Sequence, residues 1–96
     1  MGIVVTLVSE REMKRSAANG KHVQRVILER VEKTKWRLIV ILKGHTDGMT
    51  LGRYRGGTRH WAKLENALTF IERVMPAFPE EEIDVFLSQR SDSSAA

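Results

Sequence analysis

The sequence predicts an α+β fold in which a helix over about residues 62–75 packs on one face of a three- to four-stranded antiparallel meander. A second, short helix is expected near the C-terminal end. Two β-branched apolar segments, residues 22–32 and 36–42, lie on either side of a short polar turn and indicate a central hairpin. Apolar residues then recur at helical spacing until Pro76, which ends the predicted helix.

The composition is that of an ordinary globular chain, with 42% hydrophobic and 29% charged residues. Its 96 residues leave room for one core, so we expect a single domain over residues 1–90 and a flexible tail over 91–96. The absence of cysteine excludes disulfides, thiolate zinc sites and a Cys nucleophile. The apolar run at residues 3–8 is too short to span a membrane, and we expect a cytoplasmic protein without membrane contacts.

At the N-terminal end, residues 2–8 predict a short buried strand because valine and isoleucine dominate the segment. Ser9 followed by Glu12 is typical of a capping box, and predicts a helix through about Ala18 with a left-handed stop at residues 19–20. The segment has few apolar residues, so a loop remains an alternative.

A two-residue turn at Lys33 and Thr34 would set the register of the central hairpin. The opposed pairs are then Val31 and Trp36, Leu28 and Ile39, Ile27 and Val40, and Val26 and Ile41. Both faces would be apolar, so each needs a cover from the helices, the N-terminal segment or a second copy of the protein. The same register places Arg30 opposite Arg37, which is unfavourable unless an anion lies nearby.

A glycine-flanked loop at residues 44–48 precedes a predicted strand over residues 49–55. Gly56-Gly57 then predicts a second tight hairpin, with Arg53 opposite His60, and Tyr54 opposite Arg59. In this ribbon Gly52 faces Trp61, and a bulge at Gly52 is the alternative that would switch faces.

Beyond Pro76, the sequence Pro79 followed by three glutamates favours a short helix through about Gln89. The alternation of Ile83, Val85 and Leu87 leaves a strand as the alternative.

The net charge of +4 is unevenly distributed along the chain. Residues 11–63 contain fourteen Lys or Arg against four Asp or Glu, whereas residues 64–96 contain two against seven. A strongly positive stretch attracts polyanions, so DNA, RNA or an acidic protein is the expected partner. The alternative is that these residues solvate turns and protect sheet edges.

The segment 53–61 is the most informative, because arginines alternate with aromatic residues around two glycines. Guanidinium groups bind phosphates, and an aromatic ring can stack on a base. Trp61 is nevertheless more easily explained as a core residue, and Tyr54 as a cation-π partner of Arg59. The candidate nucleic-acid contacts are Arg53, Arg55, Arg59, His60 and Lys63, with Lys33, Lys35 and Arg37 extending the same surface.

No catalytic or metal-binding pattern is present in the sequence. The three histidines are scattered, no serine lies in a nucleophile elbow, and no glycine-rich segment matches a phosphate-binding loop. His45 and Asp47 share one loop, but turn formation explains both. We therefore expect a protein that is not an enzyme and needs no cofactor.

Two short motifs resemble known families. Arg59-His-Trp-Ala-Lys63 resembles the phosphate-clamping motif of the double-stranded RNA binding domain, with Arg59 and His60 in place of two lysines. The pattern from Arg55-Gly to Ala67, with Arg59, Trp61 and Leu64 between, resembles a strand-to-helix segment in small accessory proteins of plasmids and other mobile elements. This second resemblance implies a factor for DNA maintenance or regulation, or an inhibitor of host defence.

The sequence therefore predicts a small, basic, nucleic-acid-binding module with a regulatory or maintenance role. The alternative is a protein-binding adaptor or inhibitor that acts through a sheet face, as a homodimer or on a different partner. That face would consist of Val26, Leu28, Ile39 and Ile41.

Overall fold

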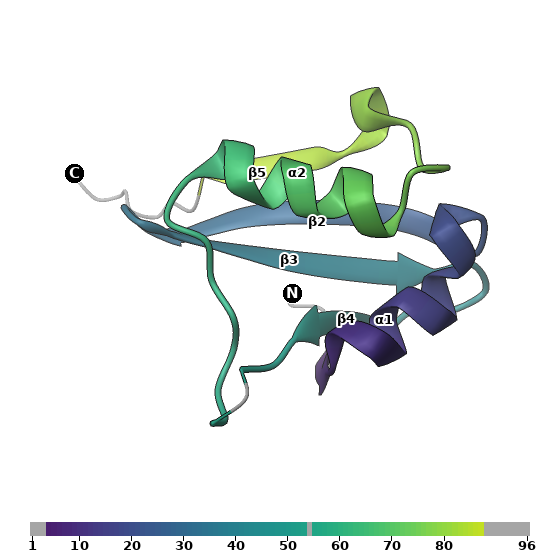
Figure 1. Ribbon diagram of the computed structural model, residues 1–96, viewed down its shortest axis with the longest axis horizontal. Helices are drawn as coiled ribbons and strands as arrows, with labels where there is room; N and C mark the ends of the chain where they lie inside the picture. The colour runs from purple at the N-terminus through teal and green to yellow at the C-terminus, as the bar shows by residue number, and fades with distance from the viewer. Residues whose placement is uncertain (1–3, 54, 88–96) are drawn as a thin grey trace.

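The computed structural model describes residues 4–53 and 55–87, which form an α+β fold with a five-stranded mixed sheet and two α-helices (Figure 1). The elements are β1 (Val5–Val8), α1 (Glu10–Ala17), η1 (Ala18–Gly20), β2 (Val23–Glu32), β3 (Lys35–Leu42), β4 (Gly48–Leu51), α2 (Leu64–Val74), η2 (Glu80–Glu82) and β5 (Asp84–Leu87). The strand order is β1-β4-β3-β2-β5. The predicted meander is confirmed only for β2, β3 and β4, because β1 and β5 each add to it in parallel.

Two of the three predicted helices form, the one after Ser9 and the one before Pro76, and local signals set their ends. The Ser9 side chain accepts a hydrogen bond of 3.1 Å from the Glu12 N–H, so the predicted N-terminal cap of α1 is confirmed. The helix stops where Ala18 and Asn19 adopt positive φ, one residue before the predicted stop. Pro76 follows the end of α2 as expected.

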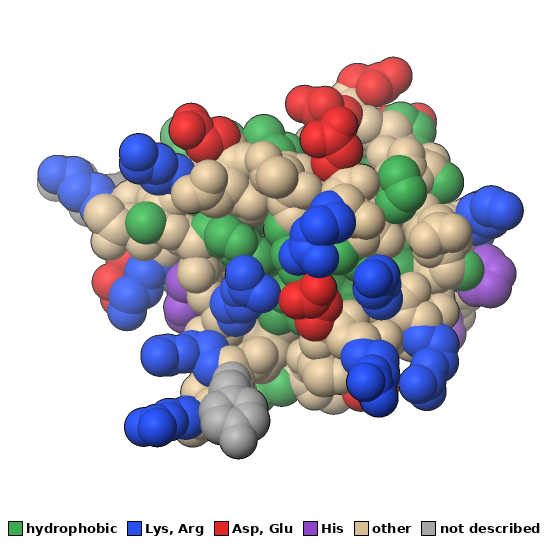
Figure 2. All heavy atoms as spheres, viewed as in Figure 1, with side chains coloured by type: hydrophobic (Ala, Val, Ile, Leu, Met, Phe, Trp, Pro, Cys, Tyr) green, Lys and Arg blue, Asp and Glu red, His purple; other side chains and the backbone are tan. Residues whose placement is uncertain are grey.

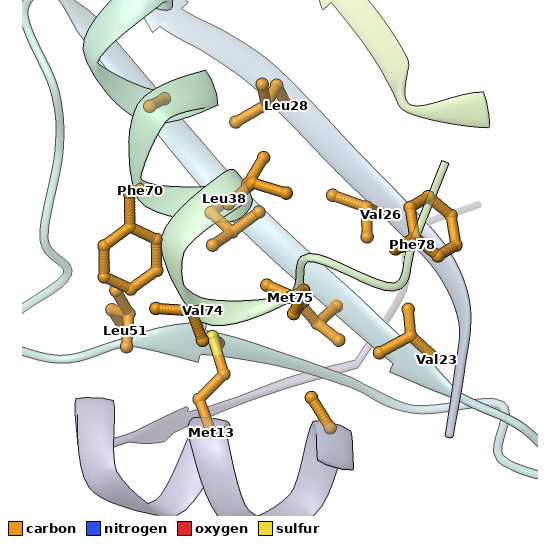
Figure 3. Close-up of a cluster of buried hydrophobic side chains, with 14 of the residues drawn as sticks. Met13, Val23, Val26, Leu28, Leu38, Leu51, Phe70, Val74, Met75 and Phe78 are labelled. Atoms are coloured by element: carbon orange, nitrogen blue, oxygen red, sulfur yellow. The ribbon is translucent and has the colours of Figure 1, made fainter. Parts of the chain in front are cut away.

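The two helices pack on the same face of the sheet and form the main core with it (Figures 1 and 3). Met13 from α1 and Phe70 and Val74 from α2 meet Leu28 and Leu38 from the central strands, and all five side chains are buried. The opposite face carries a smaller cluster, in which Ile27, Ile39 and Ile41 pack with Val5.

The predicted register of the central hairpin is wrong by one residue. Glu32 pairs with Lys35, which confirms the two-residue turn, but a β-bulge at Val31 shifts every later pair. Leu28 therefore faces Leu38, and Ile27 faces Ile39.

The shifted register also changes the partner of Arg37. Arg37 faces Glu29 instead of Arg30 and donates a hydrogen bond to its carboxylate, so the bulge converts a repulsion into an ion pair.

The predicted C-terminal helix is also wrong within the described residues. Only the three-residue turn η2 is helical there, and residues 84–87 form β5, as the alternation of apolar residues suggested. Pairing with β2 decides the outcome, supported by an ion pair of 2.9 Å between Arg25 and Asp84. Residues 88 and 89 of that helix and the predicted tail over 91–96 lie outside the described residues.

The N-terminal strand forms but is not buried as predicted. β1 is an edge strand, in which Val8 is buried while Leu7 is 50% exposed. Residues 2 and 3 of the predicted strand lie outside the described part of the chain.

Candidate nucleic-acid interface

The segment between β4 and α2 begins with a turn that encloses fewer residues than the predicted hairpin, because Gly52 pairs with a residue closer in sequence than Trp61. Gly52 pairs with Thr58, and the Arg59 N–H donates to the Leu51 carbonyl at 2.8 Å. Within the turn the Arg53 N–H donates to the Gly57 carbonyl at 2.8 Å. The predicted pairs Arg53 with His60 and Gly52 with Trp61 are therefore wrong, and Tyr54 lies outside the described residues.

A pair of tryptophans fastens this segment to the start of β3. Trp61 and Trp36 exchange two backbone hydrogen bonds of 2.7 and 3.0 Å, and both side chains are buried in the main core. The core role expected for Trp61 is confirmed. Since side chains alternate along an extended chain, His60 then faces away from the helices, as do Lys35 and Arg37 on either side of Trp36.

Arg59 points to the helix side instead and is held there. Its guanidinium group lies 4.8 Å from the Trp61 ring centroid and 5.4 Å from that of Phe70. Glu10 at the start of α1 pairs with it at 3.8 Å and with Arg73 of α2 at 3.1 Å. Arg59 thus ties the segment to both helices, and this contact competes with any role in binding phosphate.

Three of the predicted cationic residues act on His60 through their charges. Burial lowers the pKa of His60 below its usual 6.5, and the positive charges of Lys35, Arg37 and Arg53 lower it further. Glu32 opposes this shift. We call Lys35, Arg37, Arg53 and His60 the His60 cluster.

Nearby carboxylates neutralise only part of the positive charge of the His60 cluster. Arg37 is paired with Glu29, and Lys35 lies 3.8 Å from Glu32. No ion pair joins Arg53 to another described residue. A surface depression of about 390 Å³ lies between the β2–β3 turn and this segment, lined by Thr34, Lys35, Arg53, Arg59, His60 and Ala62.

The other three predicted contacts are exposed, but no interaction within the described residues joins them to the His60 cluster. Lys33 lies in the β2–β3 turn, Arg55 in the turn after β4, and Lys63 at the N-cap of α2. Gly56 and Gly57 have open space where a Cβ would lie, so the turn that carries Arg53 and Arg55 projects into solvent.

Sequence reasoning missed Glu10 as a partner of two arginines. Its only local signal was its place in the first turn of a helix, where an acidic residue is favourable in any case. Figure 2 shows the wider charge pattern, in which several acidic side chains lie along the upper edge of the molecule, and others lie at the centre and left among the Lys and Arg side chains that are spread over this face. The acidic residues that follow the basic part of the sequence include Glu72 in α2 and the three glutamates of η2.

The described residues contain no group of three His, Asp or Glu side chains that could hold a metal ion. Among the same residues, no helix is both long enough and apolar enough to cross a membrane. His45 and Asp47 are exposed in the connection between β3 and β4.

Comparisons with protein-family models, with curated proteins and with solved structures each found no match for this chain.

Proposed function

We propose that the protein is a small, non-enzymatic nucleic-acid-binding module that contacts phosphates through the His60 cluster. The observation that carries this proposal is the surface depression that Lys35 of β3 lines together with Arg53 and His60 of the segment after β4, where the charge of Arg37 also acts on His60. Such crowding of positive charge costs free energy in the isolated protein, and a polyanion bound nearby relieves it.

The surroundings of the cluster fit a nucleic-acid backbone. Lys33 and Arg55 are exposed in the two turns that border it, and Gly56 and Gly57 carry no side chain that would keep a partner at a distance. Each phosphate neutralised releases counterions, so affinity should fall steeply as salt rises.

The resemblance of residues 55–67 to accessory proteins of mobile elements supports a role in regulating or maintaining DNA. On this proposal the protein works in the cytoplasm, and its expected target is DNA or RNA.

The test is an anisotropy titration with fluorescein-labelled duplex DNA, single-stranded DNA and duplex RNA of about 20 nucleotides, each across a range of salt. We expect binding at low salt and a slope of about −0.9 in log K against log salt for each duplex phosphate contacted. Reversing two charges of the cluster, Lys35→Glu with Arg53→Glu, should weaken binding at least tenfold.

The matched control is Lys21→Glu with Lys43→Glu, which changes the net charge equally at two exposed residues away from the cluster. This control should weaken binding less than threefold. Equal losses from the two double variants, or no binding to any of the three probes at low salt, would contradict the proposal.

A second candidate function is protein binding through the sheet face opposite the helices, as an adaptor or inhibitor and as a homodimer. The face named in the sequence prediction is wrong, because Val26 and Leu28 are completely buried under the helices. Leu7 of β1 and Phe86 of β5 are each 50% exposed. Because side chains alternate along a strand, both lie on the sheet face opposite the helices, together with the small cluster that contains Ile27. These two exposed apolar side chains favour protein binding through that face.

Sedimentation equilibrium tests this second candidate directly. We expect a dimer that Leu7→Lys dissociates, with little dependence on salt. If the protein is a monomer at every concentration and binds nucleic acid in a salt-sensitive way, the second candidate is excluded and nucleic-acid binding is retained.

A further inference from the structure

A pocket of about 320 Å³ lies between α2 and the connection from α2 to β5, on a part of the molecule that includes none of the His60 cluster. Seven of its ten lining residues are apolar, and polar atoms also contribute to its surface; the apolar residues are Leu68, Ile71, Met75, Pro76, Phe78, Pro79 and Ile83. Thr69 also lines it, but its hydroxyl already donates to the Glu65 carbonyl at 3.0 Å. The apolar side chains of the lining suit an aliphatic side chain, and the polar atoms beside them suit a charged or polar neighbour of that side chain.

The outer wall of the pocket is held in place by η1. The Ala77 N–H donates to the Asn19 carbonyl at 2.7 Å, and the Phe78 N–H donates to the Met75 carbonyl at 3.1 Å. Gly20 allows this approach, because a Cβ there would lie 2.7 Å from the Phe78 nitrogen. Gly20 also has a φ of +102°, which other residues rarely adopt. The wall is thus fixed before any ligand arrives, which lowers the entropic cost of binding.

The rim of the pocket is acidic. Glu72 from α2 and Glu80 from η2 both line it and are exposed, and Glu81 and Glu82 follow in the same turn. No Lys or Arg is among the lining residues. A pocket with apolar side chains in its lining and carboxylates at its rim is complementary to an apolar side chain that has positive neighbours.

We propose that this pocket docks a short basic segment of a partner protein, with one aliphatic side chain of that segment inserted between α2 and the wall at Phe78. The flanking Lys or Arg side chains of the partner pair with Glu72 and Glu80. This inference goes beyond nucleic-acid binding and does not depend on it, because the two surfaces share no residue. The chain would then join a basic protein to a nucleic acid.

The probe for this site is a fluorescein-labelled peptide of two leucines flanked on each side by two lysines. A second peptide carries alanines in place of the leucines and has the same charge. We expect anisotropy to show binding of the leucine peptide at least five times tighter than that of the alanine peptide. Amide chemical shifts in ¹⁵N spectra should change at Leu68, Ile71 and Ile83 and stay constant at His60.

Glu80→Lys should weaken binding of the leucine peptide at least fivefold. Asp47→Lys is the matched control, because it makes the same charge change at an exposed residue outside the pocket, and it should weaken binding less than twofold. Equal affinity for the two peptides, or equal effects of the two variants, would show non-specific attraction and overturn the proposal. Self-association that Glu80→Lys abolishes would overturn it too, because the occupant would then be a second copy.

Discussion

The two faces of the sheet use the same strands for different purposes. On the helix side, Leu38 and Val40 of β3 pack into the main core, while on the other side the alternate residues Ile39 and Ile41 form only a small cluster with Ile27. Ion pairs join the strands beside this small cluster, Arg25 with Asp84 and Arg37 with Glu29. The helix side therefore supplies most of the stability, and the opposite side is free to carry charge.

Two neighbouring residues show the same division. Arg59 lies on the helix side between two aromatic rings and Glu10, whereas His60 lies among cations. Arg59 and His60 are adjacent in the same basic segment, but Arg59 has a structural role and His60 is available to a ligand.

The largest expected contrast is between adjacent core positions. Leu38→Ala should lower the free energy of unfolding by about 3 kcal/mol, because it leaves a cavity between the sheet and α2. Ile39→Ala should cost about 2 kcal/mol, at the low end for a buried isoleucine, because the cluster around it is smaller and relaxes more easily. Urea denaturation measures both values, and equal losses would show that the two faces contribute alike.

A smaller contrast is expected between two arginines of the segment after β4. Arg59→Ala should lower the free energy of unfolding by about 1 kcal/mol through loss of its contacts with Trp61 and Phe70. Arg53→Ala should change stability by less than about 0.5 kcal/mol, since its side chain is exposed. Nucleic-acid affinity should fall more for Arg53→Ala than for Arg59→Ala. A larger loss of affinity for Arg59→Ala would contradict the assignment of Arg59 to structure and Arg53 to binding.

Releasing Arg37 from its partner should strengthen binding. Glu29→Gln removes the carboxylate that pairs with Arg37, so affinity for duplex DNA at low salt should rise about threefold, in line with one added phosphate contact. Asp84→Asn is the control, because it frees Arg25, whose charge is not among those acting on His60. A gain of the same size from the control would mean that net charge alone decides affinity.

The smallest effect concerns pH. Burial and the charges of Lys35 and Arg37 lower the pKa of His60, so the unfolded chain takes up this proton before the folded protein does. The stability that a neutral His60 contributes is therefore present above pH 6.5 and is lost as the pH falls below it. His60→Gln should remove this part of the acid sensitivity, as measured by urea denaturation at pH 7.5 and 5.5.

A bound polyanion should reverse the shift at His60. It raises the pKa of the imidazole, so binding should tighten as the pH falls, and His60→Gln should abolish that dependence. The proton resonances of His60 followed through a pH titration, with and without DNA, report the shift directly. An unchanged His60 titration in saturating DNA would place the DNA elsewhere.

Strong local signals made much of the fold predictable. The Ser9 cap, the turn at Lys33 and Thr34 and the spacing that leads to Pro76 each act over a few residues, and each was confirmed. The C-terminal strand was only the alternative to a predicted helix, because Pro79 and the glutamates after it locally favour a helix, and only the distant β2 decides between the two.

The hairpin register was not predictable, because both faces of the hairpin are apolar and a one-residue shift leaves the pattern intact. The site was predictable in part. Residue types indicated His60, Lys35, Arg37 and Arg53 as basic contacts, and the pairing of Trp36 with Trp61 explains how they meet. No sequence pattern could assign Arg59 to Glu10, because that contact requires α1 to pack beside the segment after β4.

The bulge at Val31 also bears on how the chain folds. A hairpin that closes without the bulge has a non-native register that still buries similar apolar residues. Such a misfolded hairpin is destabilised mainly by the repulsion between Arg30 and Arg37, which it places opposite each other. Concentrated salt screens that repulsion. Refolding should therefore become slower and more heterogeneous as ionic strength rises, even though the native core is apolar.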